Sequence, residues 1–210
     1  MKTKSVLKLF AFAALFMFIL GFVYPTVSSI VAEGIDPFQA NGSLIEENGT
    51  VYGSYLLAQA FNESYFFQPR PSATGYSYSG SGSGSYALDA NQTLNQTRSL
   101  ISRFISENPT VNISRIPYSM VSYSGSGVDP DIPLLGAQDQ IPRITGALHF
   151  TLLAAGKNVS NTSLESFLND TVSRYTVQNF PLFGSYYVNT VQLNLAILNL
   201  LIGDGALKGY

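Results

Sequence analysis

The stretch Leu9–Val31, LFAFAALFMFILGFVYPTVSSIV, contains no charged residue. At a rise of about 1.5 Å per helical residue it reaches about 35 Å, enough to cross a hydrocarbon core about 30 Å thick with some tilt. A helix in a globular core would normally have one polar face, and a cleaved signal peptide would have a shorter apolar run with a small-residue cleavage site. The sequence therefore predicts an uncleaved transmembrane helix over residues 9–31, kinked near its outer end by Pro25.

The charges on either side of this stretch predict its orientation. Lys2, Lys4 and Lys8 precede it, and no acidic residue appears before Glu33. Because short lysine-rich flanks stay in the cytoplasm, we expect residues 1–8 to be cytoplasmic and residues 32–210 to form a single extracytoplasmic domain. The expected protein is thus a single-pass protein of the cell membrane, in contact with lipid.

The composition of the outer part narrows the range of functions. Charged residues make up 11% of the chain, against about 25% in a typical soluble protein. All 13 acidic residues lie beyond the apolar stretch with all but three of the 11 basic ones, and this acidic balance argues against a nucleic-acid partner. The chain has no cysteine and one histidine, His149, so disulfides, thiol catalysis and Cys- or His-rich metal sites are excluded. We expect His149 to be packed in a helix, and we predict no catalytic residue and no metal site.

Sequons of the form N-x-[ST] are frequent beyond the apolar stretch. Asparagines in such sequons accept glycans on the external side of a membrane, so we hypothesise that several of them are glycosylated. The nine sequons lie at Asn41, Asn48, Asn62, Asn91, Asn95, Asn112, Asn158, Asn161 and Asn169.

Hydrophobic periodicity divides the outer part into helices and a few short strands, which predicts an α+β fold. Helices are expected at residues 89–107 with Asp89 as N-cap, from the start signal Asp129-Pro130-Asp131 through Ala155, at 161–175 with a Thr162/Glu165 capping box, and at 188–202. Extended segments are expected at 50–54 and 111–121, a helix or a strand at 55–61, and a mobile glycine-serine loop at 75–85.

Two charged features each have two interpretations. Arg70 lies between Pro69 and Pro71 on a stiff segment, and its spacing favours a salt bridge over an arginine that recognises a carboxylate or phosphate. Three aspartates, Asp129, Asp131 and Asp139, could form a cation site, but helix capping and a solvated helix face are the favoured interpretation.

A series of short motifs runs in order from residue 21 to about residue 200. Its members are Gly21, Tyr24 and Pro25; Ala40 to Ser43; Gly53, Ser54, Gln59 and Phe61; Tyr65, Phe66 and Arg70 to Ala73; Ser124 to Pro130; Gln140 and Arg143; and Val188, Asn189, Leu193, Asn194 and Ala196. In this order the motifs resemble the KdpC subunit family of the Kdp potassium-transporting P-type ATPase. The chain departs from the family pattern at Asp131, where a histidine is usual, and at 183–186, where Gly-Glu-Pro is usual.

The resemblance implies a non-catalytic subunit of a high-affinity complex that imports potassium at the expense of ATP. Its implied partners are a P-type ATPase pump subunit (KdpB-like) and a potassium-channel-like subunit (KdpA-like). Its implied role is to assist assembly of the complex, to raise the ATP affinity of the pump subunit as a catalytic chaperone, or both, with Gln140 as the nucleotide-affecting residue. No cofactor is expected to be firmly bound to this subunit; ATP serves the complex and potassium is the transported ion. Candidate partner contacts are Arg70, Ser124, Gly125, Ser126, Gly127, Asp129 and Arg143.

Other roles remain open at this point. The predicted orientation places Gln140 outside and ATP inside, so a structural role, capping the external mouth of the pore subunit, is an alternative within the same family. A membrane-anchored extracellular binding or surface protein unrelated to a pump would suit the sequons and the surface rich in Ser and Tyr. An anchored hydrolase would lack the G-x-S-x-G motif and would have only His149 as a base.

Overall fold

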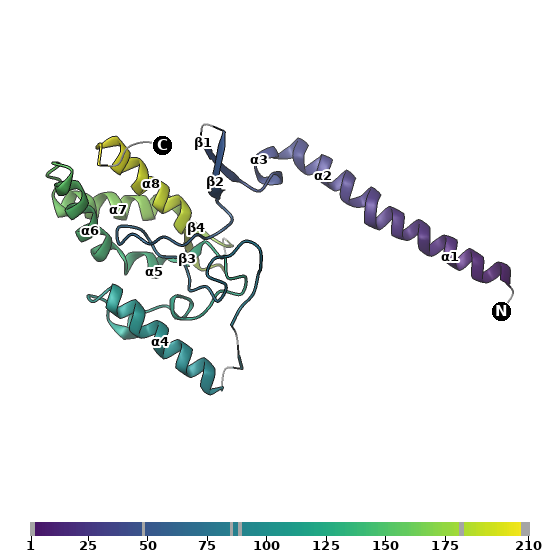
Figure 1. The fold of residues 1–210 in the computed structure, drawn as a ribbon, viewed down its shortest axis with the longest axis horizontal. Helices are drawn as coiled ribbons and strands as arrows, with labels where there is room; N and C mark the ends of the chain where they lie inside the picture. The colour runs from purple at the N-terminus through teal and green to yellow at the C-terminus, as the bar shows by residue number, and fades with distance from the viewer. Residues whose placement is uncertain (1–2, 48, 85, 88–89, 181–182, 207–210) are drawn as a thin grey trace. The chain divides into compact units, whose positions relative to one another are not determined.

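A computed structural model of the chain describes residues 3–47, 49–84, 86–87, 90–180 and 183–206 (Figure 1). The chain divides into two compact units, Met1–Tyr52 and Gly53–Tyr210.

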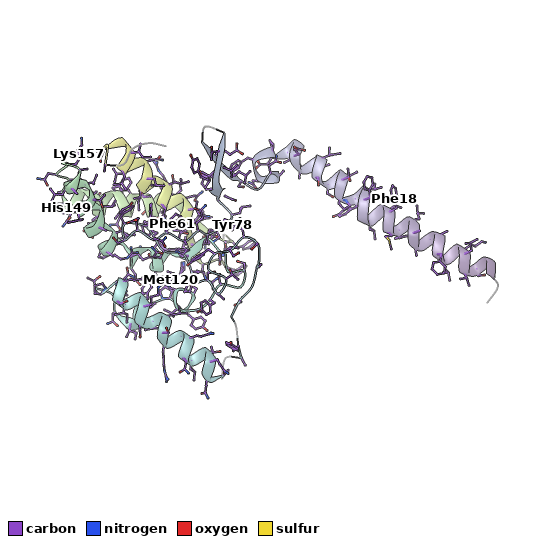
Figure 2. All side chains as sticks on the ribbon, in the orientation of Figure 1. Phe18, Phe61, Tyr78, Met120, His149 and Lys157 are labelled. Atoms are coloured by element: carbon purple, nitrogen blue, oxygen red, sulfur yellow. The ribbon has the colours of Figure 1, made fainter. Side chains whose placement is uncertain are left out.

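The N-terminal unit is dominated by one long apolar helix. It consists of α1 (Thr3–Phe18), a π-helical turn (Ile19–Val23) and α2 (Tyr24–Ile35), which run on from one another in Figure 1. Within the described residues Ser5–Ile35 is the one helix long and apolar enough to cross a membrane. Its side chains, Phe18 among them, project outward all round it (Figure 2), so it has no face buried within the chain. The helix predicted at residues 9–31 is present and extends further at both ends.

Pro25 is accommodated by a wide turn. The backbone N–H of Tyr24 donates to Ile19 O, five residues back, just before the proline in the first turn of α2. Since a proline ring crowds the carbonyl four residues earlier, here that of Gly21, a locally wider helix relieves the clash. The expected distortion therefore takes the form of a π turn. Toward its end the unit contains α3 (Pro37–Ala40) and β1 (Leu44–Glu47). Strand β1 pairs with β2 (Thr50–Ser54), which runs on past the end of the unit at Tyr52.

The second unit has an α+β architecture in which helices pack around a small antiparallel sheet. The sheet has the order β3-β5-β4, formed by Asp131–Pro133, Tyr186–Asn189 and Thr176–Gln178. Its register pairs Ile132 with Val188 and Val177 with Tyr187. The helices are α4 (Asn91–Glu107), α5 (Leu134–Gln138), α6 (Ile141–Ala154), α7 (Asn161–Tyr175) and α8 (Thr190–Gly203), with 3-10 turns at Ile113–Arg115 and Tyr118–Val121.

The core of this unit lies between α6, α7, α8 and the sheet. Its fully buried members include Ile132, Ile144, Leu148, Leu152, Leu168, Val188, Leu193, Ile197 and Leu201. Helix α4 contributes only Phe104 to the buried set and packs on the 3-10 turn at Tyr118–Val121. Helix α7 buries the apolar stripe Leu164, Leu168 and Val172, as the helical periodicity of residues 161–175 predicts.

Four predictions of local structure are wrong. Asp129-Pro130-Asp131 does not start a helix, because Asp131–Pro133 pairs with β5 as a strand and α5 begins only at Leu134. Residues 111–121 form two 3-10 turns rather than an extended segment, and residues 55–61 form turns and irregular structure. The first residues of 188–202 belong to β5, because Asn189 Oδ1 caps α8 by accepting the N–H groups of Val191 and Gln192.

Neither of the two predicted helix caps is found where the sequence placed it within the described residues. The cap of α7 is Ser160, whose Oγ accepts the N–H of Ser163 at 3.2 Å, so the capping box predicted at Thr162 is misplaced. The predicted cap Asp89 of α4 lies outside the described residues.

His149 is half-buried on α6, with Nδ1 2.8 Å from Val159 O, which confirms its packed position.

Candidate functional site

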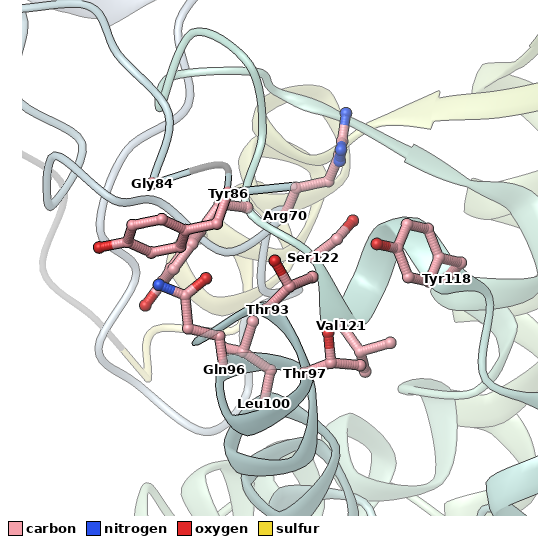
Figure 3. Close-up of a pocket in the computed structure, with 11 residues that line it drawn as sticks. Arg70, Gly84, Tyr86, Thr93, Gln96, Thr97, Leu100, Tyr118, Val121 and Ser122 are labelled. Carbon is pink, nitrogen blue, oxygen red and sulfur yellow. The ribbon is translucent and has the colours of Figure 1, made fainter. Parts of the chain in front are cut away.

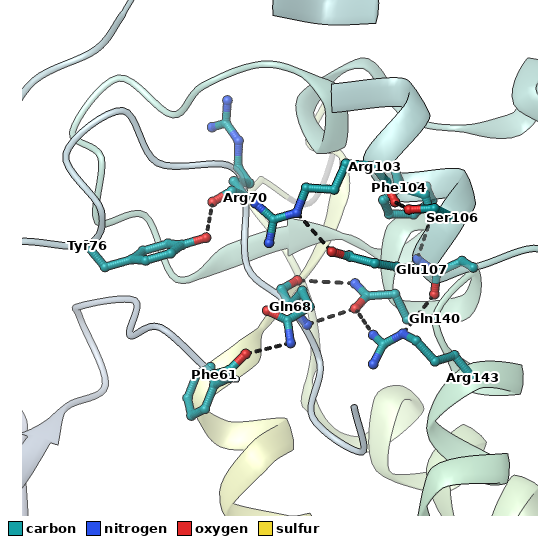
Figure 4. A network of polar contacts seen from close by, with 11 residues as sticks. Phe61, Gln68, Arg70, Tyr76, Arg103, Phe104, Ser106, Glu107, Gln140 and Arg143 are labelled. Atoms are coloured by element: carbon teal, nitrogen blue, oxygen red, sulfur yellow. Dashed lines mark hydrogen bonds and ion pairs between the residues drawn. The ribbon is translucent and has the colours of Figure 1, made fainter. Parts of the chain in front are cut away.

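The backbone of Phe67 and Gln68 in the second unit is held by side chains of α8 and of the N-cap of α6. Gln140, the N-cap of α6, accepts the N–H of Gln68 with Oε1 at 2.8 Å and donates from Nε2 to Gln68 O at 3.2 Å (Figure 4). The same Nε2 donates to Gly136 O at 3.1 Å. Gln140 is 0% exposed. Its carboxamide satisfies the backbone N–H and C=O of Gln68, which in a sheet would bond to a neighbouring strand.

A second carboxamide holds the preceding residue in the same way. Asn194 of α8 accepts the N–H of Phe67 with Oδ1 at 2.8 Å and donates from Nδ2 to Phe67 O at 2.9 Å. Asn194 is buried. We call Gln140 and Asn194 the carboxamide clamp. Because both backbone groups of two consecutive residues are held from two helices, the clamp fixes the path of the chain that leads into Arg70.

Arg143 extends the clamp toward α4. Its Nη2 donates to Gln140 Oε1 at 2.7 Å, its Nε donates to Asn108 Oδ1 at 3.0 Å, and its Nη1 donates to Phe66 O at 3.1 Å and also to Ser64 O. Burial lowers the pKa of the Arg143 guanidinium, partly offset by the charge of Glu107. The guanidinium fork therefore ties three segments of the unit together rather than pointing into solvent.

Arg70 forms the salt bridge that its spacing predicts. Its Nη1 lies 2.8 Å from Asp129 Oδ2, and its Nε donates to Ser119 O at 3.3 Å. Both side chains of the pair are half-buried. Figure 3 shows Arg70 at the edge of a cleft of about 280 Å³ with its guanidinium directed away from Thr93 and Thr97 of α4. The charge of Arg70 is thus neutralised within the chain.

The two glycine-serine segments of the sequence bind each other. Ser81 Oγ and Gly82 N both donate to Ser126 O, at 3.2 Å and 3.1 Å. Just before the first segment, Ser72 Oγ donates to Gly127 O at 2.6 Å, and Ser124 N donates to Pro71 O at 2.9 Å. The segment predicted as a mobile loop, of which Ser85 lies outside the described residues, is therefore tied to Ser124–Gly127. Within that stretch Ser124 and Gly127 are buried, Ser126 is half-buried and Gly125 is exposed.

Two aspartates near these loops are held in unfavourable surroundings for a charge. Burial, and then the neighbouring Asp129, raises the pKa of Asp131, while a hydrogen bond from Asn189 lowers it. Burial raises the pKa of Asp139 against a weaker effect of Arg115, whose Nη2 lies 3.6 Å from Asp139 Oδ1. Across the described ranges no group of three Asp, Glu, His or Cys side chains could hold a metal ion. The cation interpretation of these aspartates gains no support.

The structure thus brings together most of the predicted site residues, in two clusters. Gln140 and Arg143 belong to the clamp, while Arg70, Asp129 and the Ser124–Gly127 stretch form the adjoining loop cluster. No role is predicted from the sequence for Gln68 or Asn194. An amide residue among the apolar neighbours of the helix predicted at 188–202 is the sequence signal that could have indicated Asn194, which is buried in the structure.

These features define an α+β protein with one membrane-length helix, whose polar motif residues hold the fold of the second unit together. The chain belongs to the KdpC family, described as the K+-transporting ATPase, c chain, because the family's sequence profile matches residues 6–199. A potassium-transporting ATPase KdpC subunit of Thermoplasma acidophilum is 55% identical over 202 residues, covering 96% of this chain and 96% of the relative. The corresponding subunit of Thermoplasma volcanium is 50% identical over 208 residues, covering 98% and 96%.

A more distant relative also matches over most of the chain. The KdpC subunit of Caldanaerobacter subterraneus subsp. tengcongensis is 34% identical over 187 residues, covering 89% of this chain and 91% of the relative. The matches span the apolar helix and the second unit alike. The resemblance found in the ordered motifs is confirmed, and family membership argues against the alternative of a surface protein unrelated to a pump.

Proposed function

We propose that this protein is the non-catalytic accessory subunit of a high-affinity, ATP-driven potassium import complex. It assembles with a P-type ATPase pump subunit (KdpB-like) and a potassium-channel-like subunit (KdpA-like), which hold the ATP and the potassium pathway. The observation that carries the proposal is the family match over residues 6–199. Relatives of nearly the same length are named potassium-transporting ATPase KdpC subunits.

We further propose that the chain crosses the cell membrane once, with residues 1–8 in the cytoplasm and the second unit outside. The apolar helix Ser5–Ile35 supports this orientation, because its charge-free stretch 9–31 follows Lys2, Lys4 and Lys8. The exposure of every sequon asparagine that the structure describes is consistent with it.

Within the complex, the geometry of Gln140 favours assembly over direct contact with ATP. A carboxamide offers two acceptor and two donor positions. Gln140 uses its acceptors for Gln68 N and Arg143 Nη2 and its donors for Gln68 O and Gly136 O. A nucleotide would have to displace these bonds in a fully buried position. Gln140 therefore acts on the complex by holding the fold of the second unit, and any effect on ATP affinity is indirect.

The test is extraction of the tagged native protein in mild detergent, followed by mass spectrometry and a potassium-stimulated ATPase assay. We expect two larger membrane subunits to co-purify with activity. A chain that came out alone and inert would overturn the proposal.

The role of Gln140 is tested in the same preparation. We expect Gln140→Ala to reduce the yield of assembled complex while leaving the apparent KM for ATP of the remaining complex unchanged. The control is Gln138→Ala, because Gln138 is exposed on α5. A raised KM with full assembly would instead favour a direct effect on the nucleotide.

A further inference from the structure

The sequons of the chain differ in how their acceptor amide is held. The asparagines of the eight described sequons are all exposed, so exposure alone does not distinguish them. Four of them lie in the long helices: Asn91 and Asn95 in α4, and Asn161 and Asn169 in α7. In a helix the side chains of residues i and i+2 point to different sides, so the hydroxyl of the sequon is turned away from the amide. Asn169 also donates from Nδ2 to Glu165 O at 2.9 Å.

The sequon Asn112-Ile113-Ser114 is arranged differently. Asn112 Oδ1 accepts both the backbone N–H of Ser114, at 3.0 Å, and the hydroxyl of the same residue, at 2.9 Å. All three residues are exposed, and Ile113 is 58% exposed. Within the described part of the chain Asn112 Nδ2 has no hydrogen-bond partner. The nitrogen that would receive a sugar is therefore free in solvent, while its carbonyl oxygen is held by two donors.

No other described sequon shows this arrangement. In the loop sequon of Asn158, the Ser160 hydroxyl is used to cap α7. In the turn after α3, Asn41 Nδ2 donates to Pro37 O at 2.8 Å. At the start of α4, Thr93 Oγ1 of the Asn91 sequon donates to Ala87 O at 2.8 Å. The hydroxyl-to-amide contact within a sequon is thus specific to Asn112 among the eight.

We infer that Asn112 is an N-glycan acceptor, modified by an external transferase that uses a lipid-phosphate-linked sugar. An amide nitrogen is a poor nucleophile because its lone pair is delocalised into the carbonyl group. Two donors on Oδ1 draw electron density toward the oxygen and make the Nδ2 protons more acidic. A base of the transferase takes one proton, Nδ2 bonds to the anomeric carbon, and the bond from that carbon to the phosphate oxygen breaks with its electron pair leaving on the phosphate.

The inference rests on the proposed external position of the second unit, so orientation and modification are measured separately. Orientation is read by labelling a Ser99→Cys variant with a membrane-impermeant maleimide in intact cells. The chain has no native cysteine and Ser99 is exposed on α4, so the label reports this position alone. Labelling of intact cells supports the external position; labelling only after lysis overturns both the orientation and the glycan.

Modification is read by mass spectrometry of peptides from the full-length protein, purified from membranes of its native host. We expect a sugar increment on the peptide that contains Asn112. The increment should be lost in Asn112→Gln and in Ser114→Ala, and retained in Ser114→Thr, which keeps the hydroxyl. Because the wild-type peptide is measured directly, a variant that fails to fold does not decide the result.

Two outcomes would overturn the inference while leaving the proposed function intact. One is an Asn112 peptide found only at its bare mass in a protein whose Ser99→Cys variant is labelled from outside. The other is a glycan on the helical sequons Asn95 or Asn169 with Asn112 unmodified.

Discussion

The side-chain oxygen of Gln140 accepts two hydrogen bonds, one from Arg143 and one from the backbone of Gln68, a residue far away in the sequence. Arg143 Nη2 donates to Gln140 Oε1 at 2.7 Å, and the same oxygen accepts the N–H of Gln68 at 2.8 Å. Since residues three apart on a helix lie on the same face, the spacing Gln-x-x-Arg allows both side chains to reach residues 64–68. The motif is thereby explained by the packing of the second unit.

The first prediction concerns the guanidinium of Arg143. We expect Arg143→Lys to lower the free energy of unfolding of the protein by about 2–3 kcal/mol, because an ammonium cannot reach Asn108, Phe66 O and Gln140 at once and leaves buried acceptors without donors. Chemical denaturation of the purified chain measures the loss. Arg174→Lys, at an exposed position on α7, is the matched control. Equal stability of the two variants would show that the fork is dispensable.

The second prediction concerns the other half of the carboxamide clamp. Asn194→Ala removes both partners of the Phe67 backbone, and each buried group left without a partner costs about 1–3 kcal/mol. We therefore expect a loss of about 3 kcal/mol in unfolding free energy. Asn199→Ala on the same helix is the control, because Asn199 is exposed; it should change stability little. If Asn194→Ala behaved like its control, the clamp would not stabilise the chain.

What the sequence could predict follows from local signals. Two helices could be predicted from short stretches of sequence: one from the uncharged run at residues 9–31, the other from the helical spacing of Leu164, Leu168 and Val172. The structure has a helix at both places. The ordered motifs identified the family for the same reason. A salt bridge of Arg70 was favoured on the spacing of the prolines alone, without a named partner, and the structure shows it to Asp129 at 2.8 Å.

What the sequence could not predict depends on distant partners. Asp131–Pro133 has the composition of a helix start and is a strand only because β5, far along the chain, pairs with it. The clamp joins Phe67 and Gln68 to α6 and α8 through side-chain-to-backbone bonds, which leave no periodic pattern. The contact between the two glycine-serine segments also joins distant parts of the chain, so the sequence of neither segment could predict it.

The third prediction concerns this contact. Gly127 has φ +75, and a Cβ there would lie 2.4 Å from Thr74 Oγ1 and 3.0 Å from Gly82 O. We expect Gly127→Ala to destabilise the chain by about 1–3 kcal/mol, since it combines a strained backbone with a clash against the facing loop. Limited proteolysis should then cut residues 75–84 faster. Gly125→Ala is the control, because a Cβ at Gly125 meets nothing within 4 Å; equal cleavage rates would contradict the prediction.

The fourth prediction concerns pH. The pKa values of Asp131 and Asp139 are raised in the folded chain, mainly by burial, above the ordinary value of 3.8. The folded state therefore binds the carboxyl protons of Asp131 and Asp139 more tightly than the unfolded state does. The stability that the two protonated carboxyl groups contribute is fully present below about pH 3.8, and it is lost as the pH rises through their folded pKa values. We expect the unfolding free energy to fall over this range for these two groups, against the usual trend of paired carboxylates.

Neutral variants isolate this effect. Asp131→Asn and Asp139→Asn remove the charge that burial penalises, so each should raise the unfolding free energy at neutral pH relative to wild type and flatten its decline above about pH 4. Asp139→Asn should have the clearer effect, because Asp139 Oδ2 is buried without a hydrogen-bond partner. Denaturant titrations from about pH 3 to about pH 7 measure both, with the exposed Asp170→Asn as a charge control. A steeper decline with pH in Asp139→Asn than in wild type would show that the folded chain favours its ionised form.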